Sequence, residues 1–290
     1  MRENKTWKVS LYIIFSLYSI LAIVPLLLVI FISLSSEADI IKYGFSFIPK
    51  HFDLAAYKAI FYDGSGIIWK ICWSLIVAVL GPIPSIIVQV GLAYALSREK
   101  FAYKKAINYL LIGTMFFVAG MVPLYIVRTT VYGLGNNPLI YFIPQITIWG
   151  VALYRTQFGQ VPNELLEAAN IEGAGEVEVL WHIVLPLSKS IIGIQYFKTA
   201  INFWNDFETS MIYMSSNAQF QTIGHYINRI LADSELLVTA MAQAGMSVDD
   251  IPLTTLKYAM AVVSMVPVFV LFPFVQKFFT KGVAVGSVKG

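Results

Sequence analysis

Long, nearly uninterrupted runs of apolar residues constrain this chain more than any other feature of its sequence. Several of them reach the roughly 20 residues that an α-helix needs to cross about 30 Å of hydrocarbon. Only 13% of the 290 residues are charged, whereas soluble domains carry about 25%. The sequence therefore predicts an all-α integral membrane protein, one membrane domain over 1–290. Its six candidate spans lie at about 11–33, 67–96, 106–127, 138–155, 190–213 and 257–279.

Three of these spans have features that bear on how they form. The run at 11–33 follows a basic start, but it is longer than the core of a signal peptide and lacks a small-residue cleavage site, which predicts an uncleaved helix. The prolines of "LGPIPS" at 80–85 are expected to kink the second span. Pro144 and Gln145 interrupt the fourth span.

The basic residues are distributed unevenly among the connections between spans. Lys and Arg concentrate on the cytoplasmic side of membrane proteins. Most of the 20 Lys and Arg residues lie before the first span, between the second and third, beside the segment 156–189, or after the sixth. This pattern predicts an even number of spans, with both termini in the cytoplasm. The connections 34–66 and 214–256 are then extracytoplasmic.

The predicted cytoplasmic segment "ELLEAANIEGAGEVEVLWHIVLPL" is rich in acid and in small residues. Pro162 suits the first turn of a helix, carboxylates stabilise that end, and Gly173 can terminate it, so we expect a helix at about 162–173. Two interpretations stay open from spacing alone. The helix is either a solvated surface element or is seated in a groove of a cytoplasmic partner with basic residues. Glu176 and Glu178, beyond the helix, are expected to be solvated.

Several functional classes are disfavoured by what the sequence does not contain. The single Cys72 rules out a disulfide framework, and the three histidines are widely separated. No "GxxxxGK[ST]" phosphate loop, HExxH or GxSxG motif occurs. We therefore expect a non-enzymatic subunit that holds no metal or cofactor of its own. The formal charge of +3 is too small to indicate a nucleic-acid partner.

The combination of "EAANIEGA" and a following "LPL" resembles the EAA motif of binding-protein-dependent ABC importer permeases. Further stretches, "FSFIPKHFDLAAYKAIF", "LAYALSREKF", "FWNDF" and "KGVAVGSVKG", resemble the MalG-like second permease of carbohydrate importers. The resemblance covers nearly the whole chain. It looks closest to the branch associated with complex oligosaccharides in Gram-positive bacteria. Two departures are Glu172, where the family more often has Asp, and Ser190, where proline is common.

The resemblance implies a type I ABC importer permease fold in a bacterial cytoplasmic membrane. The implied partners are a second permease, two ATPase subunits that bind ATP and Mg, and an extracytoplasmic binding protein that delivers an oligosaccharide. The acidic helix would be the coupling helix, in which Glu167 pairs with a basic ATPase residue and Gly173 allows a sharp turn. The implied ATPase-coupling residues are Glu164, Glu167, Ala168, Ala169, Glu172, Gly173, Ala174, Leu185, Pro186 and Lys289.

Polar residues within spans are costly and therefore indicate functional positions. The polar residues of the fifth span are mostly three or four positions apart, which places most of them along one face of the helix as a stripe. This stripe either bonds to the partner permease or lines the path of the sugar, with Phe203 and Trp204 as aromatic contacts. Arg128 either reaches the outer interface or, with Lys198, makes the path attractive to an acidic sugar. The substrate-path candidates are Gln195, Lys198, Asn202, Trp204, Asn205, Asp206 and Arg128.

Two other functions are compatible with a polytopic membrane protein. An ion-coupled secondary sugar transporter would need its own ion site and usually internal repeats, neither of which is evident. A non-transporting scaffold would have no need for the polar stripe. The connection 214–256 either reaches into the binding protein or covers the permease, and the sequence alone does not identify the sugar.

Overall fold

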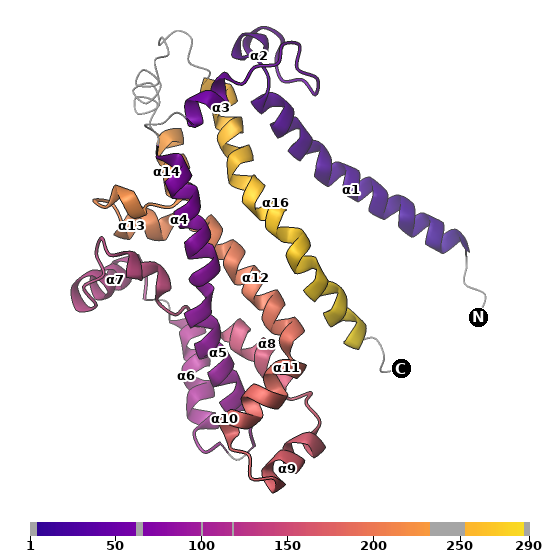
Figure 1. The fold of residues 1–290 in the computed structure, drawn as a ribbon, viewed down its shortest axis with the longest axis vertical. Helices are drawn as coiled ribbons and strands as arrows, with labels where there is room; N and C mark the ends of the chain where they lie inside the picture. Colours follow the sequence, from indigo (N-terminus) through magenta and orange to yellow (C-terminus); the bar gives the residue numbers. More distant parts are fainter. Residues whose placement is uncertain (1–4, 62–65, 100, 118, 233–252, 287–290) are drawn as a thin grey trace. The chain divides into compact units, whose positions relative to one another are not determined.

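The structure, a computed structural model, is built from helices (Figure 1). It describes residues 5–61, 66–99, 101–117, 119–232 and 253–286. Within these ranges, extended pairing is confined to one isolated bridge between Ser35 and Phe52. The all-α prediction is therefore confirmed for the part of the chain that the structure describes.

The chain divides into two compact units, Met1–Ile68 with Ile227–Val268 and Trp69–Tyr226 with Phe269–Gly290. We call them the first and the second unit. The helices of the first unit are α1 (Lys5–Ser33), α2 (Glu37–Tyr43) and α3 (Ala55–Ile60). Three helices belong partly to each unit: α4 (Ile67–Leu80), α14 (Ile223–Ala232) and α16 (Leu253–Gly286).

The second unit contains the other helices, including two π-helical turns (η2 and η4) and two 3-10 turns (η3 and η5). In chain order they are α5 (Pro82–Ser97), α6 (Lys104–Phe116), α7 (Met121–Ile126), η2 (Val127–Val131), η3 (Pro138–Phe142), α8 (Ile148–Phe158), α9 (Asn163–Ile171), α10 (Glu176–Val179), η4 (Leu180–Val184), α11 (Leu185–Leu187), α12 (Lys189–Asn205), α13 (Glu208–Tyr213) and η5 (Ala218–Phe220).

Three described segments, Lys8–Ser33, Ile67–Ser97 and Leu253–Val270, are long and apolar enough to cross a membrane. Two bent pairs, α6 with α7–η2 and α10–α11 with α12, raise the number to 5 if each pair is one span. These segments correspond to five of the six predicted spans. The predicted span at 138–155 is divided instead into η3 and the 11-residue α8. Pro144 lies in the non-helical stretch between them, as the sequence indicated.

In the first unit, the Glu37 carboxylate caps the amino-terminal end of α16. It accepts hydrogen bonds from the backbone N–H of Thr254 and Thr255 at 2.9 and 2.8 Å, and from the Thr255 hydroxyl at 3.0 Å. A carboxylate is favourable there because the first N–H groups of a helix have no partner within it. By contrast, none of the residues in the most apolar 18-residue stretch of α1 is buried within the described chain. That helix therefore offers its side chains to lipid or to another subunit.

The second unit is organised around α5, which packs against α6, α8 and α12 (Figure 1). One core cluster lies between α5 and α8 and includes Ala93, Val151 and Tyr154. A second cluster includes Trp73 of α4 and Phe203 of α12, with the Trp73 ring edge-on to Tyr141 and Phe220. α12 takes part in both packing regions, so it connects the two ends of the unit.

The second predicted span breaks at Gly81, where α4 ends at Leu80 and α5 begins at Pro82. The break within "LGPIPS" is thus where the sequence indicated. The side chain of Phe203 fills the space beside Gly81, and a Cβ at Gly81 would lie only 2.6 Å from its ring. Because Phe203 is buried in the core cluster, it has little room to move away.

We expect Gly81→Ala to destabilise the protein by roughly 1–3 kcal/mol, the usual effect of overpacking a filled core. The measurement is the apparent unfolding temperature of the purified chain in detergent. Gly91→Ala is the matched control, because a Cβ at Gly91 meets nothing within 4 Å. Equal unfolding temperatures for the two variants would contradict the packing described here.

Candidate functional site

The predicted acidic helix forms as α9, Asn163–Ile171. Pro162 directly precedes it and Glu164 lies in its first turn. Gly173 has a φ of +83°, and the Ala174 N–H donates to the carbonyl of Ala169 at 3.0 Å. A left-handed residue with this bond is a common way to end a helix, and glycine adopts it without steric cost. The predicted role of Gly173 in the turn is confirmed.

The two faces of α9 differ in what they contact. Ala169 is 9% exposed and belongs to the core cluster of α5 and α8, with Leu166 and Ala174 packed against that cluster. The family resemblance implied that Ala169 takes part in ATPase coupling. The structure instead uses its small side chain to seat α9 on the chain's own core, so Ala169 is not part of the outward face.

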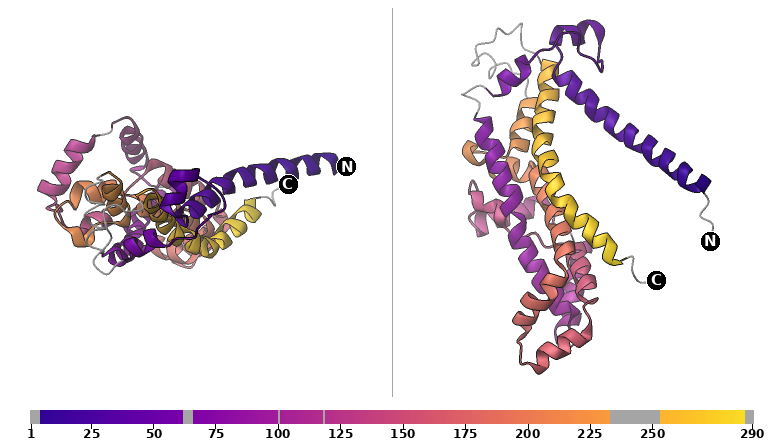
Figure 2. Two further views of the ribbon diagram at one scale, coloured as in Figure 1. Left: turned by 90° about the horizontal axis from the view of Figure 1, so that it is seen from above. Right: turned by 45° about the vertical axis from the view of Figure 1, so that its right-hand side comes forward.

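The outward face of α9 combines acidic and apolar side chains. Glu164, Glu167, Ala168 and Glu172 are exposed, and Leu165 and Ile171 are 45% and 86% exposed. The side-chain carboxylates of Glu164, Glu167 and Glu172 have no hydrogen-bond or ion-pair partner among the described residues. In Figures 1 and 2, α9 lies at one tip of the second unit, beyond the C-terminal end of α5. This face presents negative charge and apolar area to whatever lies beside it.

The two later glutamates are exposed to solvent, as expected, but each also has a hydrogen-bond partner within the chain that the sequence did not indicate. Glu178 accepts a hydrogen bond from the Gly175 N–H at 2.9 Å and so caps α10. Glu176 accepts hydrogen bonds from the Tyr94 hydroxyl at 2.5 Å and from Arg98 Nε at 3.0 Å. Sequence reasoning missed Tyr94 and Arg98. The only signal was an aromatic and a basic residue four positions apart at the end of a span.

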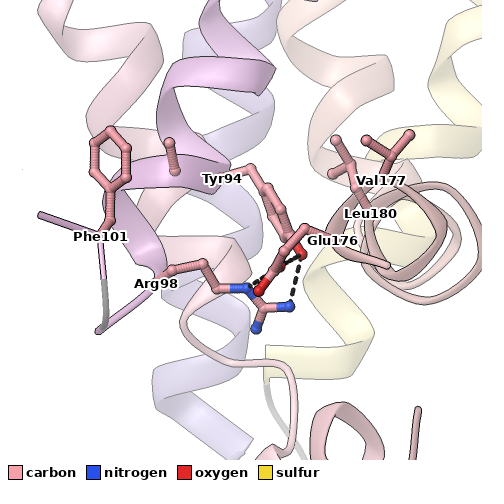
Figure 3. A pocket seen from close by; sticks show the side chains of 7 residues that line it. Tyr94, Arg98, Phe101, Glu176, Val177 and Leu180 are labelled. Carbon is pink, nitrogen blue, oxygen red and sulfur yellow. Dashed lines mark hydrogen bonds and ion pairs between the residues drawn. The ribbon is translucent and has the colours of Figure 1, made fainter. Parts of the chain in front are cut away.

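The Tyr94–Arg98–Glu176 network borders an open cavity of about 400 Å³ between α5 and α10–η4 (Figure 3). Ala95, Phe101, Val177 and Leu180 complete its lining. Farther along, Leu185 packs against the core, whereas Pro186 is exposed. The chain then bends by 80° between α11 and α12. Lys289 lies outside the described residues, as do residues 233–252 of the predicted outer connection.

The polar stripe of α12 is partly as expected. Lys198, Asn202 and Asn205 are exposed, and Gln195 is half-buried. Trp204 and Phe203 are 5% and 4% exposed, so both rings fill the core and neither is available to stack on a sugar. The two aromatic residues lie on the packed side of α12, a distinction that helical spacing alone does not make. This corrects their assignment to the substrate path.

Asp206 and Arg128 both have partners in α13. Asp206 accepts a hydrogen bond from the Thr209 N–H at 3.0 Å and so caps α13. Arg128, in the π-helical turn η2, lies 5.4 Å from the centroid of the Tyr213 ring and 3.4 Å from its hydroxyl. Tyr125 stacks on the same ring. Arg128 has no carboxylate partner within the described chain.

Comparison with known proteins places the chain. It is 29% identical over 289 residues to the polygalacturonan/rhamnogalacturonan transport system permease protein YtcP of Bacillus subtilis (strain 168), covering 99% of this chain and 100% of that one. It is 30% identical over 273 residues to protein LplC of the same organism, covering 93% and 90% of the two chains. The chain belongs to the permease family of sugar ABC transporters.

Other comparisons extend this assignment. The melibiose/raffinose/stachyose import permease protein MelC of Bacillus subtilis (strain 168) is 29% identical over 207 residues, covering 68% of this chain and 67% of MelC. A crystal structure of a bacterial ABC transporter involved in the import of the acidic polysaccharide alginate has the same fold, with a TM-score of 0.79, 24% identity and coverage of 96% and 98%. No family model matches the chain. The relatives of this permease are membrane transport proteins, not enzymes.

Because one face of α9 in this permease is buried and the other is exposed, the same substitution is expected to affect stability strongly on one face and little on the other. Ala169→Leu is expected to lower the stability by about 1–3 kcal/mol, because the added atoms have no space in the core. Ala168→Leu, one residue earlier on the exposed side, is expected to change it by less than about 0.5 kcal/mol. Apparent unfolding temperatures in detergent test both. A greater loss for Ala168→Leu would mean that α9 is rotated relative to the structure.

Proposed function

We propose that this permease is one of two transmembrane subunits of an importer that moves an oligosaccharide across the bacterial cytoplasmic membrane by alternating access. In this proposal it has six spans, a type I importer fold and both termini in the cytoplasm. A second permease, two ATPase subunits with their ATP and Mg²⁺, and an extracytoplasmic binding protein complete the complex. α9 is the helix through which ATPase movement reaches the membrane.

One observation carries this proposal, namely the outward face of α9. A helix of nine residues is too short to be stable in water by itself. Here the chain's core holds its inner face, while three carboxylates and the apolar side chains of Leu165 and Ile171 remain uncovered. A groove with an apolar floor and basic rim on a separate subunit complements that combination, since apolar contact gives affinity and charge pairing gives register.

We expect Glu167→Ala to uncouple the complex, so that ATP hydrolysis continues while sugar uptake falls at least about tenfold. Loss of one partner of a docked charge pair costs roughly 2–5 kcal/mol, enough to loosen the contact. The measurement compares ATP hydrolysis and uptake in proteoliposomes that contain the complete complex. Glu99→Gln, a change at an exposed acid outside α9, is the control. Uptake that persists without any ATPase subunit would overturn the proposed function.

The substrate we propose is an acidic oligosaccharide. YtcP is named for polygalacturonan, a polymer of uronic acids, whereas MelC is named for neutral sugars. Between these classes, the cations favour the acidic one. Arg128 lies over the ring of Tyr213, on which Tyr125 stacks, and has no carboxylate partner among the described residues. Lys198 is exposed on the polar stripe of α12. A guanidinium beside aromatic rings suits a sugar that has both a carboxylate and apolar C–H faces.

Lys198→Met is expected to reduce uptake of a uronate oligosaccharide about two- to fivefold, since a single exposed charge contributes up to about 1 kcal/mol. Uptake of a neutral oligosaccharide of equal length should change little. Both are measured in competition on the same vesicles, with Asn202→Ala as a neutral substitution on the same stripe. Equal losses for the two sugars would exclude selection by charge at Lys198.

A further inference from the structure

The network of Tyr94, Arg98 and Glu176 joins two parts of the second unit that are far apart in the sequence. Tyr94 and Arg98 are at the C-terminal end of α5, and Glu176 begins α10, five residues after α9 ends at Ile171. Figure 3 shows the three side chains converging beside the cavity. No role follows for them from docking at α9, because Glu176 lies beyond that helix.

The network is closed, and every member has two contacts within it. Arg98 Nη2 donates to the Tyr94 hydroxyl at 2.6 Å, and that hydroxyl donates to Glu176 Oε2. Arg98 Nε donates to the same carboxylate oxygen at 3.0 Å. The guanidinium also lies over the Tyr94 ring, 4.7 Å from its centroid. Hydrogen bonds to ionised groups are about twice as strong as neutral ones.

The three residues of the network differ in burial, and this indicates which of them are anchored in the core of the chain. Tyr94 is 8% exposed and anchored in the core by its ring, which also meets Phe158 edge-on. The Arg98 side chain is 20% exposed, whereas that of Glu176 is 65% exposed. Tyr94 and Arg98 are therefore held in place by the packing of α5, and the more exposed Glu176 is bound by them.

Helix macrodipoles favour the same arrangement. Arg98 follows the last turn of α5, where a cation is stabilised, and Glu176 is in the first turn of α10, where an anion is stabilised. The ion pair thus connects the negative end of one helix to the positive end of another. This geometry resists separation of the two ends.

We propose that Tyr94, Arg98 and Glu176 are positioning residues that fix the carboxyl side of α9 to α5, so that force applied to α9 moves the spanning helices instead of bending the linker. This inference rests on the proposed function of α9. Without the network, α9 keeps its apolar seat through Ala169 but is free to tilt about it, because only Glu172–Gly175 separates α9 from α10. ATP hydrolysis is then less tightly linked to uptake.

The first test measures sugar taken up per ATP hydrolysed by the complete complex in proteoliposomes. Glu176→Gln and Tyr94→Phe are expected to lower this ratio roughly three- to tenfold, the effect of losing charge-assisted hydrogen bonds. Glu99→Gln, beside Arg98 but exposed and without a partner among the described residues, should leave it unchanged. Because both variants act on one network, the double variant should be no worse than Glu176→Gln alone. Additive losses would overturn the proposal.

The second test measures the position of α9 directly in the complex. Spin labels at Asn170→Cys on α9 and Ala102→Cys after α5, with Cys72→Ser as background, report the distance between the two elements. One narrow distance distribution is expected, which Glu176→Gln broadens and Glu99→Gln does not. A residue needed only for stability would lower the unfolding temperature and leave the distribution unchanged, which would overturn a positioning role.

The two tests separate failure of this inference from failure of the proposed function. If the unsubstituted complex imports no sugar with ATP, the proposed function is wrong, and the spin-label distances still decide whether the network positions α9. If the unsubstituted complex is coupled and Glu176→Gln matches Glu99→Gln in both tests, the network has no positioning role. Tyr94→Phe retains the buried ring, so it keeps the test valid even if Glu176→Gln folds poorly.

Discussion

Helix α9 cannot hold itself in place, and the organisation of the second unit around it follows from that constraint. Nine residues form barely two and a half turns, which water would unfold without tertiary packing. The chain supplies this packing on one side only, through Ala169 and its neighbours Leu166 and Ala174. A left-handed Gly173 then ends the helix and turns the chain back toward α5. The result is a short helix whose inner face packs on the core of its own chain and whose outer face is exposed.

Sequence reasoning predicted the features that depend on local chemistry. The helix at 162–173, the termination at Gly173 and the break within "LGPIPS" all follow from proline and glycine backbone preferences, and all three form. Pro144 indicated an interruption of the predicted span at 138–155, but the span was still predicted as one helix. Hydropathy is averaged over a window, so it does not register that a proline ends the helix. The count of six spans and the orientation of the termini stay predictions.

Features that depend on contacts distant in sequence were not predictable. The spacing of polar residues on α12 gave the direction of a stripe, but not that Trp204 beside it fills the core. Likewise, Glu176 has the sequence context of a solvated acid. Its partners Tyr94 and Arg98 precede it by about 80 residues, and only the packing of α5 against neighbouring helices brings them together. A single sequence contains no periodic signal for a pairing of this kind.

The connection between the two proposed sites is α12 itself. After α10 the chain passes through a π-helical turn, bends by 80° and enters α12. The middle of α12 is fastened to α4 by the Tyr196 hydroxyl, which donates to the Val79 carbonyl at 2.6 Å, and its far end by Phe203 beside Gly81. Close-packed cores transmit displacement instead of absorbing it. The bend between α11 and α12 is therefore the place where the chain would flex most readily. A network that holds α10 against α5 restricts this flexing. In the proposed mechanism, movement at α9 reaches the polar stripe near Lys198 as a shift of a stiff helix.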